Sequence, residues 1–338
     1  MKRCAEWKYC LMASAVLICL LLVLALLTVE PAATEPPPTE DLLSGEDNPE
    51  GIDLLPSGEV DSGYTVRVLR GDTVTEMTMS EYLQGVVRAE MPASFEQEAL
   101  CAQTVAARTY TLYKMNQGSH AGAADICTNA ACCQAWQDRD TAMAAWGADG
   151  ERNEAKIANA VAATDGQALV YGGAPILAVF HAASAGQTSG AGAVWSGDLP
   201  YLQSVSSPED DGAVPNYYSR VEIPNHQFRK TFLAAHPEAD FSGDPKGWIG
   251  EAALAEDGVR VDTITVGGVT VRGVEIRQLY GLRSTAFETE AEDGKVVFYV
   301  TGYGHGVGMS QYGADYLARQ GYTYQEILAH YYTDVTIG

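Results

Sequence analysis

The sequence predicts an α+β fold, in which one domain mixes helices with antiparallel strands and follows a single transmembrane helix and a disordered linker. Three observations predict this organisation. An uncharged apolar stretch lies near the N-terminus, an acidic stretch rich in Pro, Gly and Ser follows it, and the remainder alternates between helical and strand periodicities. The chain therefore divides into a cytoplasmic tail (1–9), a membrane span (10–29), a linker (30–62) and one folded domain (63–338).

The composition restricts the partners. The 338 residues carry a formal net charge of −23 and include 46% hydrophobic residues, enough for a sizeable core. The acidic balance excludes nucleic acid as a partner, because phosphate contacts require clustered Lys and Arg. An uncharged polymer such as a sugar chain fits this surface better than an anionic one.

Residues 10–29 are long enough to span a membrane, since 20 residues at ~1.5 Å each match a ~30 Å hydrocarbon core. Lys and Arg precede this stretch and acidic residues follow it, so we expect a single-pass cell-membrane protein with its domain outside. A cleaved signal peptide, with small residues at 31–33, is the alternative; its apolar core is usually ~7–15 residues. The linker cannot bury a core and is expected to reach toward a cell wall.

A strand is expected at 64–70, and the first clear helix covers Ser80–Glu90. Glu90 falls on the apolar face of this helix, and Met91-Pro92 ends it. Desolvation there raises the pKa of a carboxyl group, which suits a general acid near neutral pH. The alternative is a structural ion pair of Glu90 with Arg88 or Arg108. The apolar face consists of Tyr82, Leu83, Val86 and Val87.

A second helix is expected to begin at Ser94, with Gln97 completing a capping box. Arg108 and Tyr110 lie near its middle. Small side chains keep this helix slim, so that a neighbour packs closely and frames a cleft with Glu90. These side chains are Ala99, Ala102, Ala106 and Ala107.

An insertion at 116–150 holds His120, Cys127, Cys132 and Cys133. Four nitrogen and sulfur ligands suit a tetrahedral Zn²⁺ site, and because they leave no open position the site would be structural. A disulfide and scattered buried thiols are the alternatives. Adjacent cysteines bridge only with strain, which disfavours a disulfide between Cys132 and Cys133.

After a helix at 152–163, strands are expected at 167–171 and 175–180, joined by Gly172-Gly173 as a hairpin turn. His181, Ser184 and Gln187 follow the second strand. Polar residues at the end of a strand commonly line a site. For His181, the alternative is a satisfied surface histidine.

Further strands are expected over 259–287, with a turn at Gly267-Gly268, and at 295–300. The last strand leads into a glycine-rich segment, 302–311, that contains His305 and Gln311. Glycines allow tight turns and the close approach of a ligand, but the segment lacks the Gly-Lys-Ser/Thr ending of a phosphate loop. Two helices close the chain, the second with a capping box at Thr323 and Glu326.

Several segments resemble, in the same order along residues 64–338, the SpoIID/LytB family of sporulation proteins. They are EYLQGVVRAEMP (81–92), EALCAQTVAARTY (98–110), FHAASAGQT (180–188), LRSTAF (282–287), GHGVGMSQYGA (304–314) and ILAHYY (327–332). The resemblance implies a SpoIID-type catalytic domain with lytic transglycosylase activity. Such enzymes cut the bond between N-acetylmuramic acid and N-acetylglucosamine and leave a 1,6-anhydro end. The catalytic acid falls in the Glu-Met-Pro motif, at Glu90.

The resemblance also implies zinc in the insertion, as in clostridial members, through the segments at 125–127 and 133–136. Cys132 stands where relatives often carry His, Cys101 where they commonly carry Lys, and Ala183 and Ala185 where they carry small polar or glycine residues. The implied role is engulfment during sporulation, on peptidoglycan strands stripped of stem peptides. The implied partners are the membrane-bound amidase-endopeptidase SpoIIP and SpoIIM.

The motifs contain one obvious carboxylate, whereas hydrolytic glycosidases usually place two across the bond. A transglycosylase can use one group twice, first as acid and then as base toward the C6 hydroxyl of the sugar. A non-catalytic glycan-binding enhancer of an amidase and an ordinary muramidase are the alternatives. The residues expected to hold the sugar are Arg108, Tyr110, His181, Ser184, Gln187, His305 and Gln311.

Overall fold

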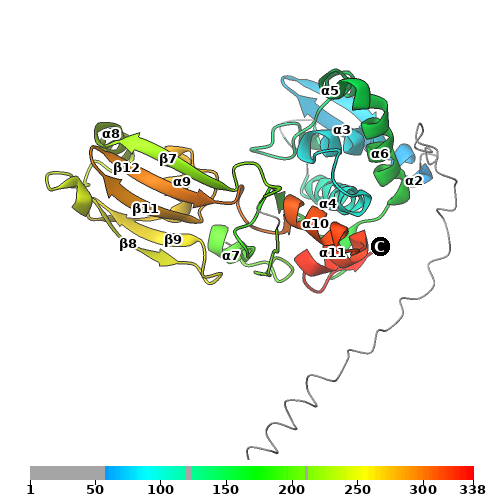
Figure 1. Cartoon of the computed structure of the whole chain (residues 1–338). Helices are drawn as coiled ribbons and strands as arrows, with labels where there is room; N and C mark the ends of the chain where they lie inside the picture. Colours follow the sequence, from blue (N-terminus) through cyan, green and yellow to red (C-terminus); the bar gives the residue numbers. More distant parts are fainter. Residues whose placement is uncertain (1–57, 119, 121–123, 196, 210–211) are drawn as a thin grey trace, which may run out of the picture. The chain divides into compact units, whose positions relative to one another are not determined.

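The computed structural model describes residues 58–118, 120, 124–195, 197–209 and 212–338, coloured along the chain in Figure 1. The expected membrane span and most of the expected linker lie outside these residues. Among the helices that the structure describes, none is both long and apolar enough to cross a bilayer. Helices and strands alternate through the described part, which confirms the α+β prediction.

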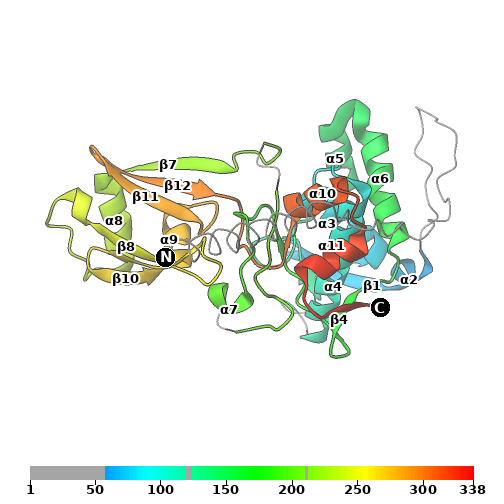
Figure 2. The same cartoon turned by 60° about the horizontal axis from the view of Figure 1, so that its bottom comes forward.

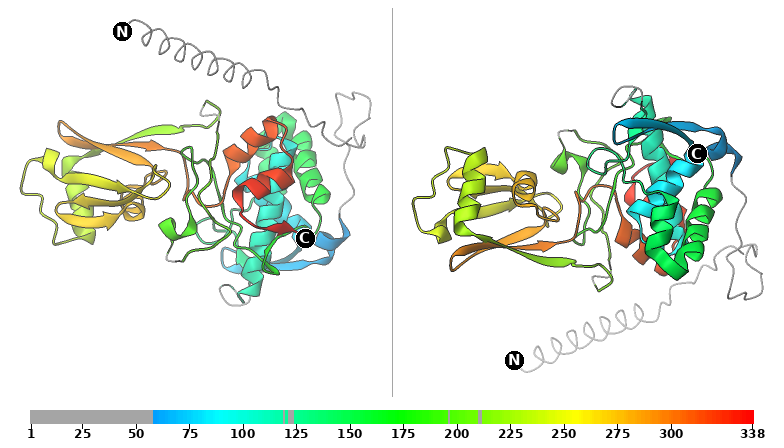
Figure 3. Two further views of the ribbon diagram at one scale, coloured as in Figure 1. Left: turned by 90° about the horizontal axis from the view of Figure 1, so that it is seen from below. Right: turned by 90° about the horizontal axis from the view of Figure 1, so that it is seen from above.

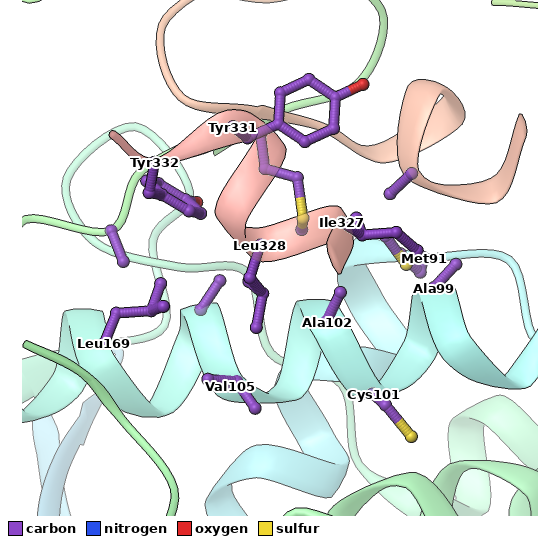
Figure 4. Close-up of a cluster of buried hydrophobic side chains, with 14 of the residues drawn as sticks. Met91, Ala99, Cys101, Ala102, Val105, Leu169, Ile327, Leu328, Tyr331 and Tyr332 are labelled. Carbon is purple, nitrogen blue, oxygen red and sulfur yellow. The ribbon is translucent and has the colours of Figure 1, made fainter. Parts of the chain in front are cut away.

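Helix α4 (Gln97–Asn116) is a central element of a large hydrophobic core. Its alanines are fully buried, as the predicted slim helix requires. Figure 4 shows Ile327 and Leu328 of the last helix facing Ala102 and Val105 of α4. Burial of apolar area stabilises by about 25 cal/mol per Å², so this core contributes to the stability of the fold that carries the site. The helices packed on α4 are α3 (Met79–Glu90), α6 (Gly150–Ala163), α10 (Gln311–Arg319) and α11 (Tyr324–Tyr331).

Short elements surround this core. The sheet β2-β1-β3 consists of β2 (Thr73–Thr78), β1 (Thr65–Arg70) and β3 (Ile126–Cys127), with β3 parallel to β1. The others are β4 (Leu169–Tyr171), β5 (Ala174–Pro175), β14 (Thr336–Ile337), α2 (Glu59–Gly63), α5 (Arg139–Trp146), η1 (Gly147–Asp149) and α7 (Ala191–Val194). Strand β6 (Phe180–His181) pairs in parallel with β13 (Met309–Ser310), which joins two segments that the sequence assigned to the site.

Residues 218–301 contribute a second hydrophobic core, built from two three-stranded antiparallel sheets and two helices (Figures 2 and 3). Phe228, Phe232 and Phe298 are its largest fully buried side chains. The elements are β7 (Tyr218–Pro224), α8 (Asn225–Ala235), η2 (Pro245–Gly247), β8 (Ile249–Leu254), β9 (Val261–Val266), β10 (Val269–Arg272), α9 (Gly273–Tyr280), β11 (Phe287–Glu292) and β12 (Lys295–Thr301).

Many predicted elements are confirmed. The strand at 64–70 is β1, the helices at 80–90 and 152–163 are α3 and α6, and the Gly172-Gly173 hairpin joins β4 to β5. The strand at 295–300 is β12, the turn at Gly267-Gly268 joins β9 to β10, and Thr323 with Glu326 forms the capping box of α11.

Other predictions about the elements were wrong. Helix α4 begins at Gln97 rather than beside Ser94, because the backbone N–H of Glu96 donates to Asp315 Oδ1 from α10. Residues 273–280 form a helix instead of a strand, because this turn of helix places Ile276 in the second core. Residues 176–179 are irregular and do not extend a strand.

The end of the expected linker is folded. Residues 59–62 belong to α2, and the backbone N–H groups of Val60 and Asp61 donate to the Asp165 carboxylate. The Asp61 side chain is buried. Local composition missed this segment because its partners lie far along the chain: the backbone N–H of Asp61 binds Asp165, 104 residues away, and its carboxylate binds Arg108, 47 residues away.

Candidate active site

Glu90 is the last residue of α3 and continues its buried face. The N-cap of the helix is Thr78, whose hydroxyl accepts from the backbone of Glu81 in a capping box, and Met91 ends the helix with extended backbone before Pro92. Glu90 itself is half-buried. The other residues of the face are fully buried, as their spacing predicted: Tyr82, Leu83, Val86 and Val87.

Two neutral groups contact the Glu90 carboxylate. The backbone N–H of Ala135 donates to Oε1 at 2.7 Å, and Gln311 Nε2 lies 3.5 Å from Oε2. The nearby arginines have other partners: Arg88 binds Glu154 and Arg108 binds Asp61. Within the part of the chain that the structure describes, Glu90 has no ion-pair partner, which excludes the ion-pair alternative.

The surroundings of Glu90 favour its protonated form. Burial raises the pKa of this carboxyl group, and the hydrogen bonds from Ala135 and Gln311 lower it only in part. A cation beside Glu90 would have held its pKa down instead. The site therefore contains a carboxylic acid with an elevated pKa, which is the property of a proton donor near neutral pH.

Gln311 connects Glu90 to the central helix. It opens α10 directly after Ser310, the N-cap residue, whose hydroxyl accepts from Gly313 N–H. Its Nε2 also lies 3.4 Å from Oε1 of Gln103, a fully buried residue of α4. Three helices thus contribute to one polar group, from α3, α4 and α10.

His181, Ser184 and His305 form a second polar group, next to the Ser310–Gln311 segment through the β6–β13 pairing. His181 Nδ1 lies 3.2 Å from the Val307 carbonyl oxygen, so Nδ1 carries the proton and Nε2 accepts from the Ser184 hydroxyl at 2.7 Å. Burial lowers the pKa of His181 well below its usual value. The alternative of a surface histidine is wrong, because His181 is buried.

The half-buried ring of His305 lies 5.6 Å from His181 and 5.4 Å from Trp195, between ring centroids. Burial lowers the pKa of His305 to about 4. Gln187 is exposed, and its carbonyl oxygen accepts from Arg260. Neither side chain reaches Glu90 through a hydrogen bond that the structure describes.

Arg108 and Tyr110, both predicted to hold the sugar, form no hydrogen bond with Glu90 in the described residues. Arg108 is 1% exposed and donates to Asp61, to the Gln167 carbonyl and to Thr164. This arrangement leaves the guanidinium no free surface for a sugar, so the structure gives Arg108 a fold-stabilising role in place of the predicted one. The hydroxyl of Tyr110 faces the Cys132 carbonyl at 3.4 Å, beside the cysteine cluster.

His120, Cys127, Cys132 and Cys133 converge as predicted, with all four ligand atoms within 4.8 Å of one another. Cys132 Sγ lies 3.6 Å from His120 Nε2 and 4.0 Å from Cys133 Sγ. Ligand atoms of a tetrahedral zinc site lie about 3.5–3.8 Å apart, so this group fits Zn²⁺ after a small contraction. The described cysteines are free, which disfavours the disulfide alternative.

The cysteine cluster and Glu90 are joined by residues 134–136. Gln134 is buried and donates to Tyr82, Ala107 and Thr111. Ala135 supplies the N–H that binds Glu90. A Cβ on Gly85 of α3 would lie 2.0 Å from Trp136 Nε1, so only glycine lets this ring pack against the helix. Gln134 and Trp136 thus hold the segment that orients the acid against α3 and α4.

Sequence reasoning missed Ala135, Gln103 and Asp61. The contribution of Ala135 is a backbone N–H, which carries no signal in the residue type. Gln103 lies one turn before Ala107 on the slim face of α4, so its spacing could have placed it toward the site. Asp61 was missed because it lies at the end of an acidic segment whose composition is typical of a linker.

This geometry defines a candidate acid–base site with one carboxyl group that lacks an ion-pair partner in the described residues, and beside it a group of four potential metal ligands. Residues 70–171 match the family model of stage II sporulation protein, SpoIID. Stage II sporulation protein D of Bacillus amyloliquefaciens is 36% identical, over 78% of this chain and 75% of its own length. The same protein of Bacillus subtilis is 34% identical, over 78% and 76%. The chain therefore belongs to the SpoIID family.

A more distant relative has a different name. The amidase enhancer of Bacillus subtilis is 28% identical over 75% of this chain and 40% of its own length. Family membership identifies the chain as a sporulation protein of the cell wall.

Proposed function

We propose that the protein is a peptidoglycan lytic transglycosylase, with Glu90 as the catalytic acid, that remodels the septal cell wall during engulfment. The observation that carries the proposal is the half-buried Glu90 carboxyl group with neutral hydrogen-bond partners and a raised pKa. The second support is membership of the SpoIID family.

In the proposed reaction, the Glu90 carboxylic acid gives its proton to the glycosidic oxygen, and the bond from that oxygen to C1 of N-acetylmuramic acid breaks. The C6 hydroxyl of the same sugar attacks C1, and Glu90, now a carboxylate, takes the hydroxyl proton. The product is a 1,6-anhydro end, and Glu90 is protonated again. Proton transfer of this kind contributes ~10²–10⁴-fold, and the tethered hydroxyl adds the advantage of proximity.

We choose the residues proposed to contact the substrate by where they lie relative to Glu90. Gln311 touches the catalytic acid and orients it, and His305 offers a half-buried ring between His181 and Trp195. Ser184 and Gln187 belong to the adjoining segment. Tyr110 and Arg108 support the cysteine cluster and the fold. We keep His305, Gln187 and Gln311 as the residues that hold the sugar and its N-acetyl group.

A structural Zn²⁺ would be held by His120, Cys127, Cys132 and Cys133, and its chemistry is to cross-link the insertion. Sheet β1–β3 fixes Cys127, since Asp125 accepts two hydrogen bonds from the Arg67 side chain. The loop that follows is then oriented with Ala135 N–H toward Glu90.

The location and partners follow from the same assignment. The apolar stretch at 10–29 would anchor the protein in the cell membrane with its domain outside, facing peptidoglycan. The partners are denuded glycan strands, SpoIIP and SpoIIM. The second candidate function is enhancement of an amidase, and it is favoured by the 28% identical relative named amidase enhancer.

Mass spectrometry of denuded glycan strands treated with the purified full-length protein tests the assignment. The transglycosylase account predicts 1,6-anhydro ends from the wild type and none from Glu90→Gln. Reducing ends would identify a muramidase, and bound but uncut glycan would identify a non-catalytic enhancer. Equal activity in Glu90→Gln would overturn the role of Glu90.

A further inference from the structure

Glu209 is a second buried carboxyl group that the proposed mechanism does not use. It follows the loop after α7, outside every motif that predicted the site. Its Oε1 accepts three hydrogen bonds: from the backbone N–H of Ser184 at 2.6 Å, the hydroxyl of Ser310 at 2.6 Å and the hydroxyl of Ser207 at 3.2 Å. Its Oε2 is buried and has no hydrogen-bond partner in the described residues.

The three donors come from three separate segments. Ser184 also binds His181, so this donor belongs to the second polar group of the site. Ser207 is the neighbour of Tyr331 in α11, with the two hydroxyl oxygens 3.0 Å apart. Ser310 is the N-cap of α10. One carboxylate oxygen therefore cross-links the loop after β6, the loop before residue 210 and the start of α10.

The link through Ser310 leads to the catalytic acid. Ser310 accepts from Gly313 N–H and donates to Glu209, so its side chain fixes where α10 begins. The next residue, Gln311, is the one that lies against Glu90 and Gln103. A shift of the helix start by less than 1 Å would already weaken the contact between Gln311 and Glu90, which is 3.5 Å long.

The surroundings of the Glu209 carboxyl group shift its pKa in opposite directions. Burial raises its pKa to about 7, although the three donors and the more distant Arg260 favour the ionised form. The other groups around it are Tyr331, whose pKa is raised by burial, and His181, whose pKa is lowered by burial. Arg260 forms its ion pair with Asp257 rather than with Glu209.

We infer that Glu209 is a positioning residue for catalysis: by binding Ser310 it places Gln311 against Glu90, and so sets the orientation and protonation of the catalytic acid. This inference rests on the proposed function for its kinetic consequences, and on the geometry of Glu209, Ser310 and Gln311 for the coupling itself.

A double-mutant cycle on the full-length protein tests the coupling. Loss of one charge-assisted hydrogen bond corresponds to about a 10- to 100-fold change in rate, so we expect Glu209→Ala to lower kcat by about that factor with little change in KM. Gln311→Ala should lower kcat by at least as much and also raise KM, because Gln311 is proposed to contact the sugar as well. The double variant should lose no more than about twofold beyond Gln311→Ala. Glu209→Gln keeps an oxygen at Oε1 and should retain most of the activity.

A second readout does not depend on activity. The ¹³C shift of the Glu90 carboxyl group reports its titration, and loss of the Gln311 hydrogen bond should raise the pKa of Glu90 in Glu209→Ala, as in Gln311→Ala. The matched control is Asp315→Asn, another buried carboxylate of α10, whose side chain binds Glu96 N–H and Arg319 and forms no hydrogen bond with the side chain of Ser310 or Gln311 in the described residues. It should lower stability without moving the Glu90 titration.

The two accounts fail in different ways. A wild-type protein that releases no anhydro ends would overturn the proposed function, while the Glu90 titration would still decide the positioning role. An unchanged Glu90 titration in Glu209→Ala, or multiplicative losses in the double variant, would overturn the inference. So would a shift of the same size in Asp315→Asn, since that result would mean general loosening of α10.

Discussion

Asp61 and Glu90 are two carboxyl groups close to helix α4, and their surroundings differ in one respect. Asp61 is 2% exposed and has a guanidinium partner, Arg108, whose Nη2 lies 2.5 Å from its Oδ2. Glu90 is half-buried and has only the amide groups of Ala135 and Gln311. The fold thus pairs the buried Asp61 carboxylate with a cation, whereas it gives Glu90, the proposed proton donor, only neutral partners.

Glu154 extends the same lesson. Its carboxylate binds Arg88, which stands two residues before Glu90 in α3. The arginine that would be the nearest cation in sequence is therefore turned to another acid. Both arginines that the sequence offered as partners for Glu90 bind other acids, so neither offsets the rise in the pKa of Glu90 that its burial causes.

The largest expected effect is a loss of stability when the buried ion pair between Asp61 and Arg108 is broken. Arg108→Met leaves Asp61 buried without a cation, which should destabilise the fold by about 3–5 kcal/mol. Urea unfolding followed by circular dichroism measures the change. Arg152→Met is the matched control, because Arg152 and Asp149 are both exposed and such pairs contribute about 0–1 kcal/mol. Equal effects in the two variants would contradict the assigned role of the buried pair.

Removal of the proposed Zn²⁺ should weaken the contacts that orient Glu90. Without a cross-link, Cys132 and Cys133 should release the loop that carries Ala135, and the loss of its hydrogen bond to the neutral Glu90 carboxyl group corresponds to about a 2- to 10-fold lower rate. Metal analysis, glycan cleavage and the melting temperature, each before and after treatment with a chelator, measure the effect. A purified domain with less than about half an equivalent of zinc under reducing conditions would count against the site.

A smaller effect on the same loop comes from Gly85→Ala. The new Cβ would overlap Trp136, and overpacking of this kind costs about 1–3 kcal/mol, against a gain of up to about 1 kcal/mol in helix propensity. We expect a net loss of stability together with reduced cleavage. Gly63→Ala, at a helical position with open space around it, should show neither; a stabilised and fully active Gly85→Ala would show that Trp136 does not hold the loop.

The smallest effect concerns pH and stability. The pKa of Glu90 is above its ordinary value of 4.5, so the folded state holds this proton over a range in which the unfolded state has lost it, and stability falls as pH rises through that range. Glu90→Gln removes this pH dependence of stability, because an amide does not titrate in this range. Thermal unfolding from pH 4 to pH 9 should show the variant gaining on the wild type as pH rises, whereas a gain on acidification would mean that Glu90 is ionised and stabilised in the fold.

Local patterns were sufficient to place much of the site. The spacing of Val86 and Val87 put Glu90 on a buried face, and the spread of His120 to Cys133 predicted the cluster that the fold brings together. Long-range partners were not readable in this way. The pairing of Arg108 with Asp61 spans 47 residues, and that of Gln311 with Glu90 spans 221.

The misread elements have similar causes. Residues 273–280 carry the β-branched Val274 and Ile276, which favour strands, but burial of Ile276 in the second core makes them a helix. The start of α4 was misplaced because the N–H of its N-cap residue, Glu96, binds Asp315 of α10, and Ser94 does not cap the helix. In both cases a tertiary contact overrode a local preference.

Cleavage of denuded glycan in H₂¹⁸O is the measurement that tests most directly whether one carboxyl group, Glu90, acts as both acid and base. The account predicts 1,6-anhydro ends that contain no ¹⁸O from the wild type, because the attacking oxygen is the C6 hydroxyl of the sugar. It predicts no products from Glu90→Gln. Reducing ends labelled with ¹⁸O, or unlabelled anhydro ends released by Glu90→Gln at the wild-type rate, would contradict it.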